Sequence, residues 1–237
     1  MRPPARLTDV LSQLVHIVAP PRCIGCLREQ TWLCQSCQKH IGQFPLSCIG
    51  CSKANPRGLT CDACRASTAL TGVVAVGSYR HLLLQRGIGW LKYKGVTAIA
   101  PVLATLLLPR LLAIAPWEEL QRIAMLVPLP LHSRRQRERG FNQSEKIALA
   151  ISDATSIPVV PLLTRPRATW TQSHLPHDLR QHNVQTAFAI NGSVPRDRTI
   201  AIIIDDVATT GATLSAAALP LKKAGVPIIW GAVIARG

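Results

Sequence analysis

The sequence predicts an α/β fold, in which a parallel sheet is flanked by helices and preceded by a small cysteine-rich module. Three observations lead to this prediction. All eight cysteines lie between residues 23 and 64. After them, apolar segments of strand length alternate with segments of helical periodicity, which is typical of a parallel sheet covered on both faces. One apolar segment, 200–204, runs directly into two adjacent aspartates and a threonine-rich turn, which core packing alone does not explain.

We expect three parts along the 237 residues: an N-terminal amphipathic helix over 1–20, the cysteine module over 21–68 and the α/β domain over 69–237. The longest apolar stretch, 98–115, is interrupted by prolines and an arginine, so it falls short of the ~20 apolar residues that a membrane span needs. No signal-peptide pattern is visible near the N-terminus. We therefore expect a cytoplasmic protein without a membrane span.

The cysteines form four Cys-x-x-Cys pairs, which are Cys23/Cys26, Cys34/Cys37, Cys48/Cys51 and Cys61/Cys64. Each such turn directs two thiolates to one point, and two turns complete the tetrahedral shell of a structural Zn²⁺. The short intervals favour sequential pairing into two tandem zinc ribbons over interleaved pairing. A thioredoxin-like redox role would need only one pair, within an α/β context. We expect two structural zinc ions, which either support a nucleic-acid or partner surface or replace the core that so short a module cannot build.

The α/β domain is predicted element by element from periodicity and turn signals. Strands are expected over 72–79, 122–130, 159–163, 200–205 and 227–235, and helices over 82–95, 96–114, 141–155 and 212–225. In parallel sheets, ligands bind outside the carboxyl ends of the strands. Asp205, Asp206 and the loop after them are therefore expected in a binding crevice.

This loop has the composition of a phosphate-binding site. It consists of Ala208, Thr209, Thr210, Gly211, Ala212 and Thr213, between a strand and a helix N-terminus. Small residues let backbone N–H groups converge, and the helix dipole favours an anion there. The two carboxylates suit sugar hydroxyls or Mg²⁺ instead. The alternative is a simple threonine N-cap preceded by two turn aspartates.

The segment IIIDDVATTGAT, 202–213, resembles the phosphoribosyl pyrophosphate (PRPP) loop of type I phosphoribosyltransferases. The resemblance implies that fold, with Asp205 and Asp206 on the ribose hydroxyls, Ala208 to Thr213 around the 5′-phosphate, and Mg²⁺ bound together with PRPP. The segments 79–95, 127–151 and 163–188, together with the cysteine pairs, resemble the ComF family and within it the GntX-type DNA-utilisation proteins.

Two basic segments acquire roles through the same resemblance. Arg134, Arg135 and Arg139 stand where related proteins carry a pyrophosphate-binding loop, and the segment from Gly140 to Gln143 is expected to line the crevice. The alternative for the arginines is a solvated charged face. Arg165, Arg167, Trp170 and Arg180 fall in the position of a hood over the site, where cations and a stacking ring suit a base or single-stranded nucleic acid. A packing role is the alternative for the tryptophan.

The formal net charge of +15 favours polyanionic partners. The resemblance implies a cytoplasmic protein that handles internalised DNA, in DNA uptake, transformation or use of DNA as a nutrient, and that carries a PRPP-type site. Its partners would be PRPP or a related phosphoribosyl ligand, single-stranded DNA and DNA-uptake proteins. The alternative is a catalytically active phosphoribosyltransferase of nucleobase salvage. We favour the first, because no base-selecting element is recognisable and both parts of the chain are basic.

Overall fold

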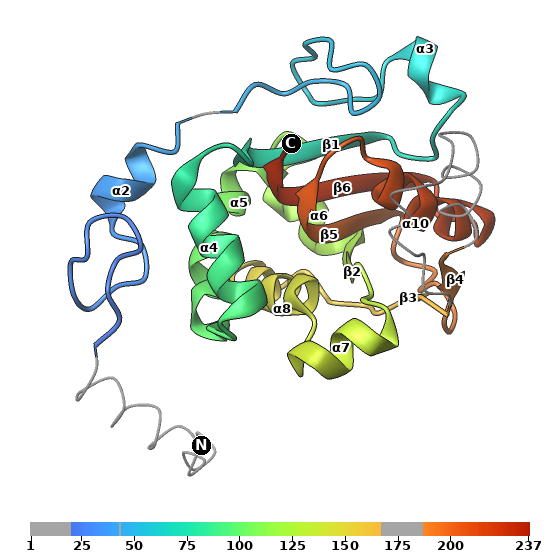
Figure 1. The fold of residues 1–237 in the computed structure, drawn as a ribbon. Coiled ribbons are helices and arrows are strands. Elements are labelled where there is room, and N and C mark those ends of the chain that lie inside the picture. The colour runs from blue at the N-terminus through green and yellow to red at the C-terminus, as the bar shows by residue number, and fades with distance from the viewer. Residues whose placement is uncertain (1–19, 43, 167–186) are drawn as a thin grey trace, which may run out of the picture. The chain divides into compact units, whose positions relative to one another are not determined.

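A computed structural model describes residues 20–42, 44–166 and 187–237 (Figure 1). The chain divides into two compact units, Met1–Gly42 and Gln43–Gly237, so the division falls between the two halves of the cysteine-rich segment. The smaller unit holds the short helix α2, Gln35–Lys39, and the first four cysteines. The amphipathic helix expected near the N-terminus lies outside the described residues.

The larger unit is built on a four-stranded parallel sheet with the order β1-β6-β5-β2, which can be followed in Figure 1. The strands are β1, Gly72–Ser78; β2, Ala124–Pro128; β5, Ile200–Ala208; and β6, Ile228–Arg236. Trp230 in β6 is in register with Gly72 on one side and Ile202 on the other. The two central strands are apolar along almost their whole length, because both of their faces are covered. The predicted α/β fold with its parallel sheet is confirmed.

The segment predicted as a strand over 159–163 differs from the prediction. Val159 forms only an isolated parallel bridge to Leu126, flanked by two backbone hydrogen bonds of 2.9 Å. Pro158 and Pro161 lack N–H donors and interrupt the ladder there. The chain then enters the short strand β3, Leu163–Thr164, which pairs antiparallel with β4, Ala189–Ile190.

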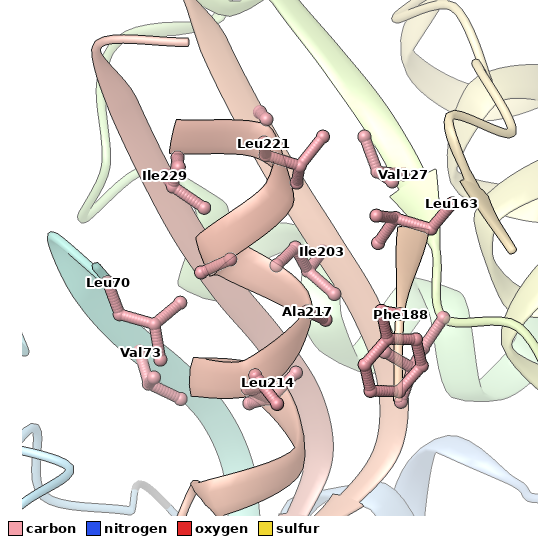
Figure 2. Close-up of a cluster of buried hydrophobic side chains, with 14 of the residues drawn as sticks. Leu70, Val73, Val127, Leu163, Phe188, Ile203, Leu214, Ala217, Leu221 and Ile229 are labelled. Carbon is pink, nitrogen blue, oxygen red and sulfur yellow. The ribbon is translucent and has the colours of Figure 1, made fainter. Parts of the chain in front are cut away.

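Helices cover both faces of the sheet. The helices of the larger unit are α3, Asp62–Arg65; α4, Leu82–Tyr93; η1, Thr97–Ile99; α5, Ala100–Leu111; α6, Trp117–Ile123; α7, Ser133–Arg139; α8, Gln143–Thr155; and α10, Ala212–Lys223. Figure 2 shows Leu214, Ala217 and Leu221 of α10 packed against Val73, Ile203 and Ile229 of three strands. Alternate residues such as Leu126 and Ile202 are equally buried on the opposite face, where α5 and α8 pack. Within the described ranges, no helix has the length and apolarity to cross a membrane.

Helix α7 stands where the resemblance implied a loop. The His132 side chain accepts a hydrogen bond from the backbone N–H of Arg134 at 3.3 Å and caps the helix, and Gly140, with φ +76°, ends it. Arginine and glutamine are good helix formers, so the charged run 134–139 extends through two turns. This short helix carries the predicted arginines toward the carboxyl end of the sheet.

Candidate functional site

The two adjacent aspartates near the end of β5 are buried, and both accept hydrogen bonds from neighbouring groups. The exposed fractions of Asp205 and Asp206 are 8% and 3%. Asp205 Oδ1 accepts hydrogen bonds from Ser144 Oγ and from the backbone N–H of Asp206, each at 2.9 Å. Asp206 Oδ1 accepts from Gln143 Nε2 at 3.2 Å, and its second oxygen pairs with Lys92 Nζ. The first turn of α8 and the end of α4 therefore hold both carboxylates.

The closeness and burial of the two carboxyl groups favour a state in which they share a proton or bind a cation. Burial raises the pKa of Asp205 well above its usual range, the negative charge of Asp206 raises it further, and the hydrogen bond from Ser144 lowers it. Two neighbouring buried carboxylates resist ionising together unless a positive charge compensates them. Lys92 supplies one such charge. A divalent cation or a ribose with its hydroxyl donors would supply further stabilisation.

A pocket of about 610 Å³ shares Lys92 with the acid pair, and its lining consists of Lys92, Tyr93, Gly95, Arg135, Glu138, Arg139 and Phe141. Arg139 connects the pocket to the acid pair, because it donates from Nη1 to Gln143 Oε1 at 2.9 Å while Gln143 binds Asp206. The Arg139 guanidinium also lies 5.5 Å from the centre of the Tyr93 ring. The lining combines three cations with aromatic rings, a chemistry suited to phosphates and bases.

The predicted arginines occupy different places. Arg135 and Arg139 line the pocket, whereas Arg134 pairs with Glu138 at 2.9 Å on an exposed part of α7. Arg165 lies with its guanidinium 5.3 Å from the centre of the Phe188 ring. Burial lowers the pKa of Arg165, the positive charge of Arg135 lowers it further, and the negative charge of Asp205 raises it. Arg167, Trp170 and Arg180 lie outside the described residues.

The loop Ala208–Thr213 leads from β5 into α10 as predicted. Thr209 and Thr210 are exposed, and Gly211 adopts the left-handed conformation with φ +76° immediately before the helix. Thr210 Oγ1 accepts a long hydrogen bond of 3.4 Å from the N–H of Ala212. The exposed hydroxyls and the N–H groups of the first helical turn, which have no partner within the helix, together offer donors to an anion.

The cysteines form two groups, one of Cys23, Cys26, Cys34 and Cys37 and the other of Cys48, Cys51, Cys61 and Cys64, with all sulfurs of a group within 4.8 Å of one another. The sequential pairing is confirmed, and interleaved pairing is excluded. Two four-sulfur groups of this kind fit structural Zn²⁺ in tetrahedral geometry.

The protonation of the cysteines supports this assignment. Burial raises the pKa of the Cys23 and Cys48 thiols, but hydrogen bonds from backbone N–H groups outweigh burial and lower both values to about 6. Without a cation one thiol of each group resists ionisation: chiefly because of burial the pKa of Cys37 is raised to about 12, and chiefly because of the hydrogen bond with Cys61 that of Cys64 is raised to about 12. A bound Zn²⁺ removes this conflict by holding four thiolates at once.

Three residues of the site were not singled out from the sequence: Lys92, Tyr93 and Ser144. A usable signal exists for the first two, because Lys92, Tyr93, Lys94 and Gly95 place cations and an aromatic ring at the end of a helix, just before a glycine turn. Ser144 gives no such signal, since serine is common in the first turn of helices for local reasons.

The comparisons with known proteins agree with this architecture. No protein-family model matches the chain. The chain is 31% identical to competence protein F of Haemophilus influenzae over 225 residues, which is 89% of this chain and 95% of that protein. It is 32% identical to DNA utilization protein YhgH of Salmonella typhimurium, over 87% of this chain and 85% of that protein. It is also 32% identical to competence protein ComFC of Bacillus subtilis over 103 residues, which are 43% of this chain and 39% of that protein. Because the similarity to competence protein F spans almost that whole protein, the chain belongs to the ComF family of competence and DNA utilization proteins.

Proposed function

We propose that this protein handles internalised DNA in the cytoplasm and that it binds PRPP, or a related phosphoribosyl ligand, together with Mg²⁺ at the carboxyl end of β5. The observation that carries the proposal is the order of chemical groups along one edge of the sheet: a donor-rich loop, a buried acid pair and a basic pocket. The names of the relatives, competence protein and DNA utilization protein, support the part that concerns DNA.

The ligand is placed by matching its groups to these three features. The 5′-phosphate binds the loop 209–213, where hydroxyls and N–H groups converge on the N-terminus of α10. The ribose hydroxyls face Asp205 and Asp206, which accept their hydrogen bonds. The pyrophosphate and its Mg²⁺ lie toward Lys92, Arg135 and Arg139, whose charges balance it.

A calorimetric titration with PRPP and Mg²⁺ tests this site. The wild-type protein should bind, and an Asp205→Asn, Asp206→Asn double variant should lose most of the affinity, because an amide donates hydrogen bonds where the ribose hydroxyls also donate and cannot hold Mg²⁺ as a carboxylate does. Asp153→Asn on the exposed side of α8 is the matched control and should bind normally. Equal binding by the wild type and the double variant would refute the role given to the aspartates.

The DNA-binding part has its own test. Affinity for a single-stranded oligonucleotide should fall steeply as salt rises, whereas PRPP binding should respond far less, because several phosphate contacts release counterions only in the first case. Arg135→Ala should reduce the salt slope by roughly one. If no oligonucleotide binds even at low salt, direct DNA binding is wrong.

A second candidate, catalysis of phosphoribosyl transfer, is favoured by one observation. The pocket beside the acid pair carries the rings of Tyr93 and Phe141 as well as cations, so a base could stack there next to the pyrophosphate. Release of pyrophosphate from PRPP in the presence of individual nucleobases would establish this activity, and its absence with all common bases would leave ligand binding alone.

A further inference from the structure

The turn Cys48-Ile49-Gly50-Cys51, which opens the second cysteine group and is called the second knuckle, packs directly on the candidate phosphate loop. Ile49, between Cys48 and Cys51, is 5% exposed and lies against Gly211. A Cβ atom at residue 211 would come within 2.3 Å of Ile49 Cγ1. Gly211 is therefore required twice, once for its φ of +76° and once for the closeness of Ile49. Both residues of this contact belong to the larger unit.

Arg236 ties the same knuckle to the strand end at which the loop begins. This last residue of β6 is in register with Ala208 of β5. Its buried guanidinium donates to the carbonyls of Ser47, Cys48 and Ile49 at 3.3, 3.0 and 3.4 Å and to the hydroxyls of Ser47 and Ser52 at 2.7 and 3.2 Å. The N–H of the following residue, Gly237, donates to the carbonyl of Ala208 at 2.9 Å. The backbone of the knuckle and the end of β5 are thus joined by hydrogen bonds.

The positive charge of Arg236 needs a negative partner, and the second cysteine group can supply one when it holds zinc. The Arg236 guanidinium is buried and donates to the backbone of Cys48, one of the four cysteines of the second centre. In the part of the chain that the structure describes, no carboxylate forms an ion pair with this guanidinium. A zinc ion with four thiolates carries a net charge of about −2, so the loaded second centre balances the buried cation.

We propose that zinc at the second centre fixes the conformation of the loop 209–213, so that Ile49 is a positioning residue of the phosphate site. The first knuckle has the same four residues, Cys23-Ile24-Gly25-Cys26, and belongs to the other compact unit. Its isoleucine is equally buried, at 4%. The two identical knuckles therefore offer a matched comparison, and within the larger unit the second one packs on the loop. The choice of PRPP as a probe rests on the proposed function.

The experiment compares Ile49→Ala with its matched control Ile24→Ala in the full-length, zinc-loaded protein. The measurements are the affinity for PRPP with Mg²⁺, the hydrogen exchange of the backbone amides of residues 209–213, and the zinc content. Ile49→Ala should weaken PRPP binding about tenfold or more and speed exchange in the loop, with zinc content unchanged. Ile24→Ala should leave affinity and loop exchange as in the wild type. Ile49→Val should recover most of the loss, since it retains the packing at Cγ1.

Equal effects of the two alanine variants, or no effect of Ile49→Ala on loop exchange, would overturn the inference. Should Ile49→Ala not fold, the pair Ile49→Leu and Ile24→Leu replaces it, because leucine keeps the volume but moves the branch away from the Cβ and Cγ1 contact with Gly211, and equal loop exchange in that pair would overturn the inference. If the wild type binds no PRPP, the proposed function fails, while hydrogen exchange still decides whether the second centre fixes the loop.

Discussion

Lys92 at the end of α4 forms an ion pair with Asp206 in β5, and the same lysine lines the neighbouring pocket. The Lys92 side chain is 18% exposed, whereas that of Asp206 is 4% exposed. The cation that stabilises the buried carboxylate is therefore also the one that an anionic ligand in the pocket would meet. This relationship links the stability of the ligand-free protein to its affinity for phosphates.

Replacing Lys92 by methionine should lower both quantities. The free energy of unfolding should fall by about 2 kcal/mol, less than the ~3–5 kcal/mol of a fully buried pair, because Lys92 retains some contact with water. PRPP affinity should fall as well. Urea unfolding and calorimetry measure the two effects. Lys146→Met, on the exposed side of α8, is the control and should change neither. Unaltered stability of Lys92→Met would show that the ion pair contributes nothing.

The raised pKa of Asp205 predicts a dependence of stability on pH. In the folded protein the Asp205 carboxyl keeps its proton to higher pH than it does in the unfolded chain. The contribution of this proton to the free energy of unfolding is therefore complete below the ordinary aspartate pKa of about 4, and it is lost as pH rises through the raised pKa of the folded protein. Asp205→Asn removes this loss. The stability of the variant relative to the wild type should therefore increase as pH rises above the ordinary pKa of an aspartate toward the raised pKa of Asp205.

Denaturant unfolding at several pH values measures this difference, and saturating Mg²⁺ with PRPP should reduce it, because a bound cation favours the ionised carboxylate. A difference that stays constant with pH would mean that Asp205 titrates normally.

Zinc content reports how the cysteines are grouped in solution. The wild type should hold two zinc ions per chain. A Cys23→Ser, Cys37→Ser double variant alters one centre and should retain about one ion, whereas Cys37→Ser, Cys48→Ser alters both centres and should retain none. Elemental analysis of the purified proteins distinguishes these results. Loss of all zinc from the first variant would indicate that ligands from different groups share an ion.

Gly211→Ala should destabilise the protein more than the same change at Gly140. Both glycines have φ +76°, but a Cβ at Gly140 meets nothing within 4 Å, whereas one at Gly211 meets Ile49. The change at Gly140 should cost about 1 kcal/mol from backbone strain alone, and that at Gly211 about 2–4 kcal/mol, because overpacking adds to the strain. Thermal or urea unfolding of both variants gives the comparison. Equal costs would mean that the contact with Ile49 relaxes freely.

The sequence predicts the sheet well where local pattern and burial agree. The predicted strands around 72–79, 200–205 and 227–235 correspond to β1, β5 and β6, because continuous apolar runs between turn residues have few other structures available. The predictions fail where local chemistry competes. Prolines reduce 159–163 to a bridge and a short strand, and a side-chain cap turns the expected arginine loop into helix α7.

The candidate site is predictable in its loop and carboxylates but not in their surroundings. Asp205 and Asp206 stand out because two adjacent acids are unusual at the end of an apolar strand. Their partners are distant in the sequence: Lys92 is 114 residues from Asp206, and Ser144 is 61 residues from Asp205. Only the packing of α4 and α8 against the sheet brings these side chains together. The contact of Ile49 with Gly211 is equally long-range, and the identical Ile24 shows that the local sequence does not encode it.

The decisive measurement is a crystal structure of the zinc-loaded protein with PRPP and Mg²⁺. We expect the 5′-phosphate on the backbone amides of Thr210 to Thr213, the ribose hydroxyls on Asp205 and Asp206, and the pyrophosphate beside Lys92 and Arg139. Ile49 should still cover Gly211 in that complex. A structure in which PRPP lies elsewhere, or in which the loop stays empty under saturating ligand, would contradict the assignment of a phosphoribosyl site to the end of β5.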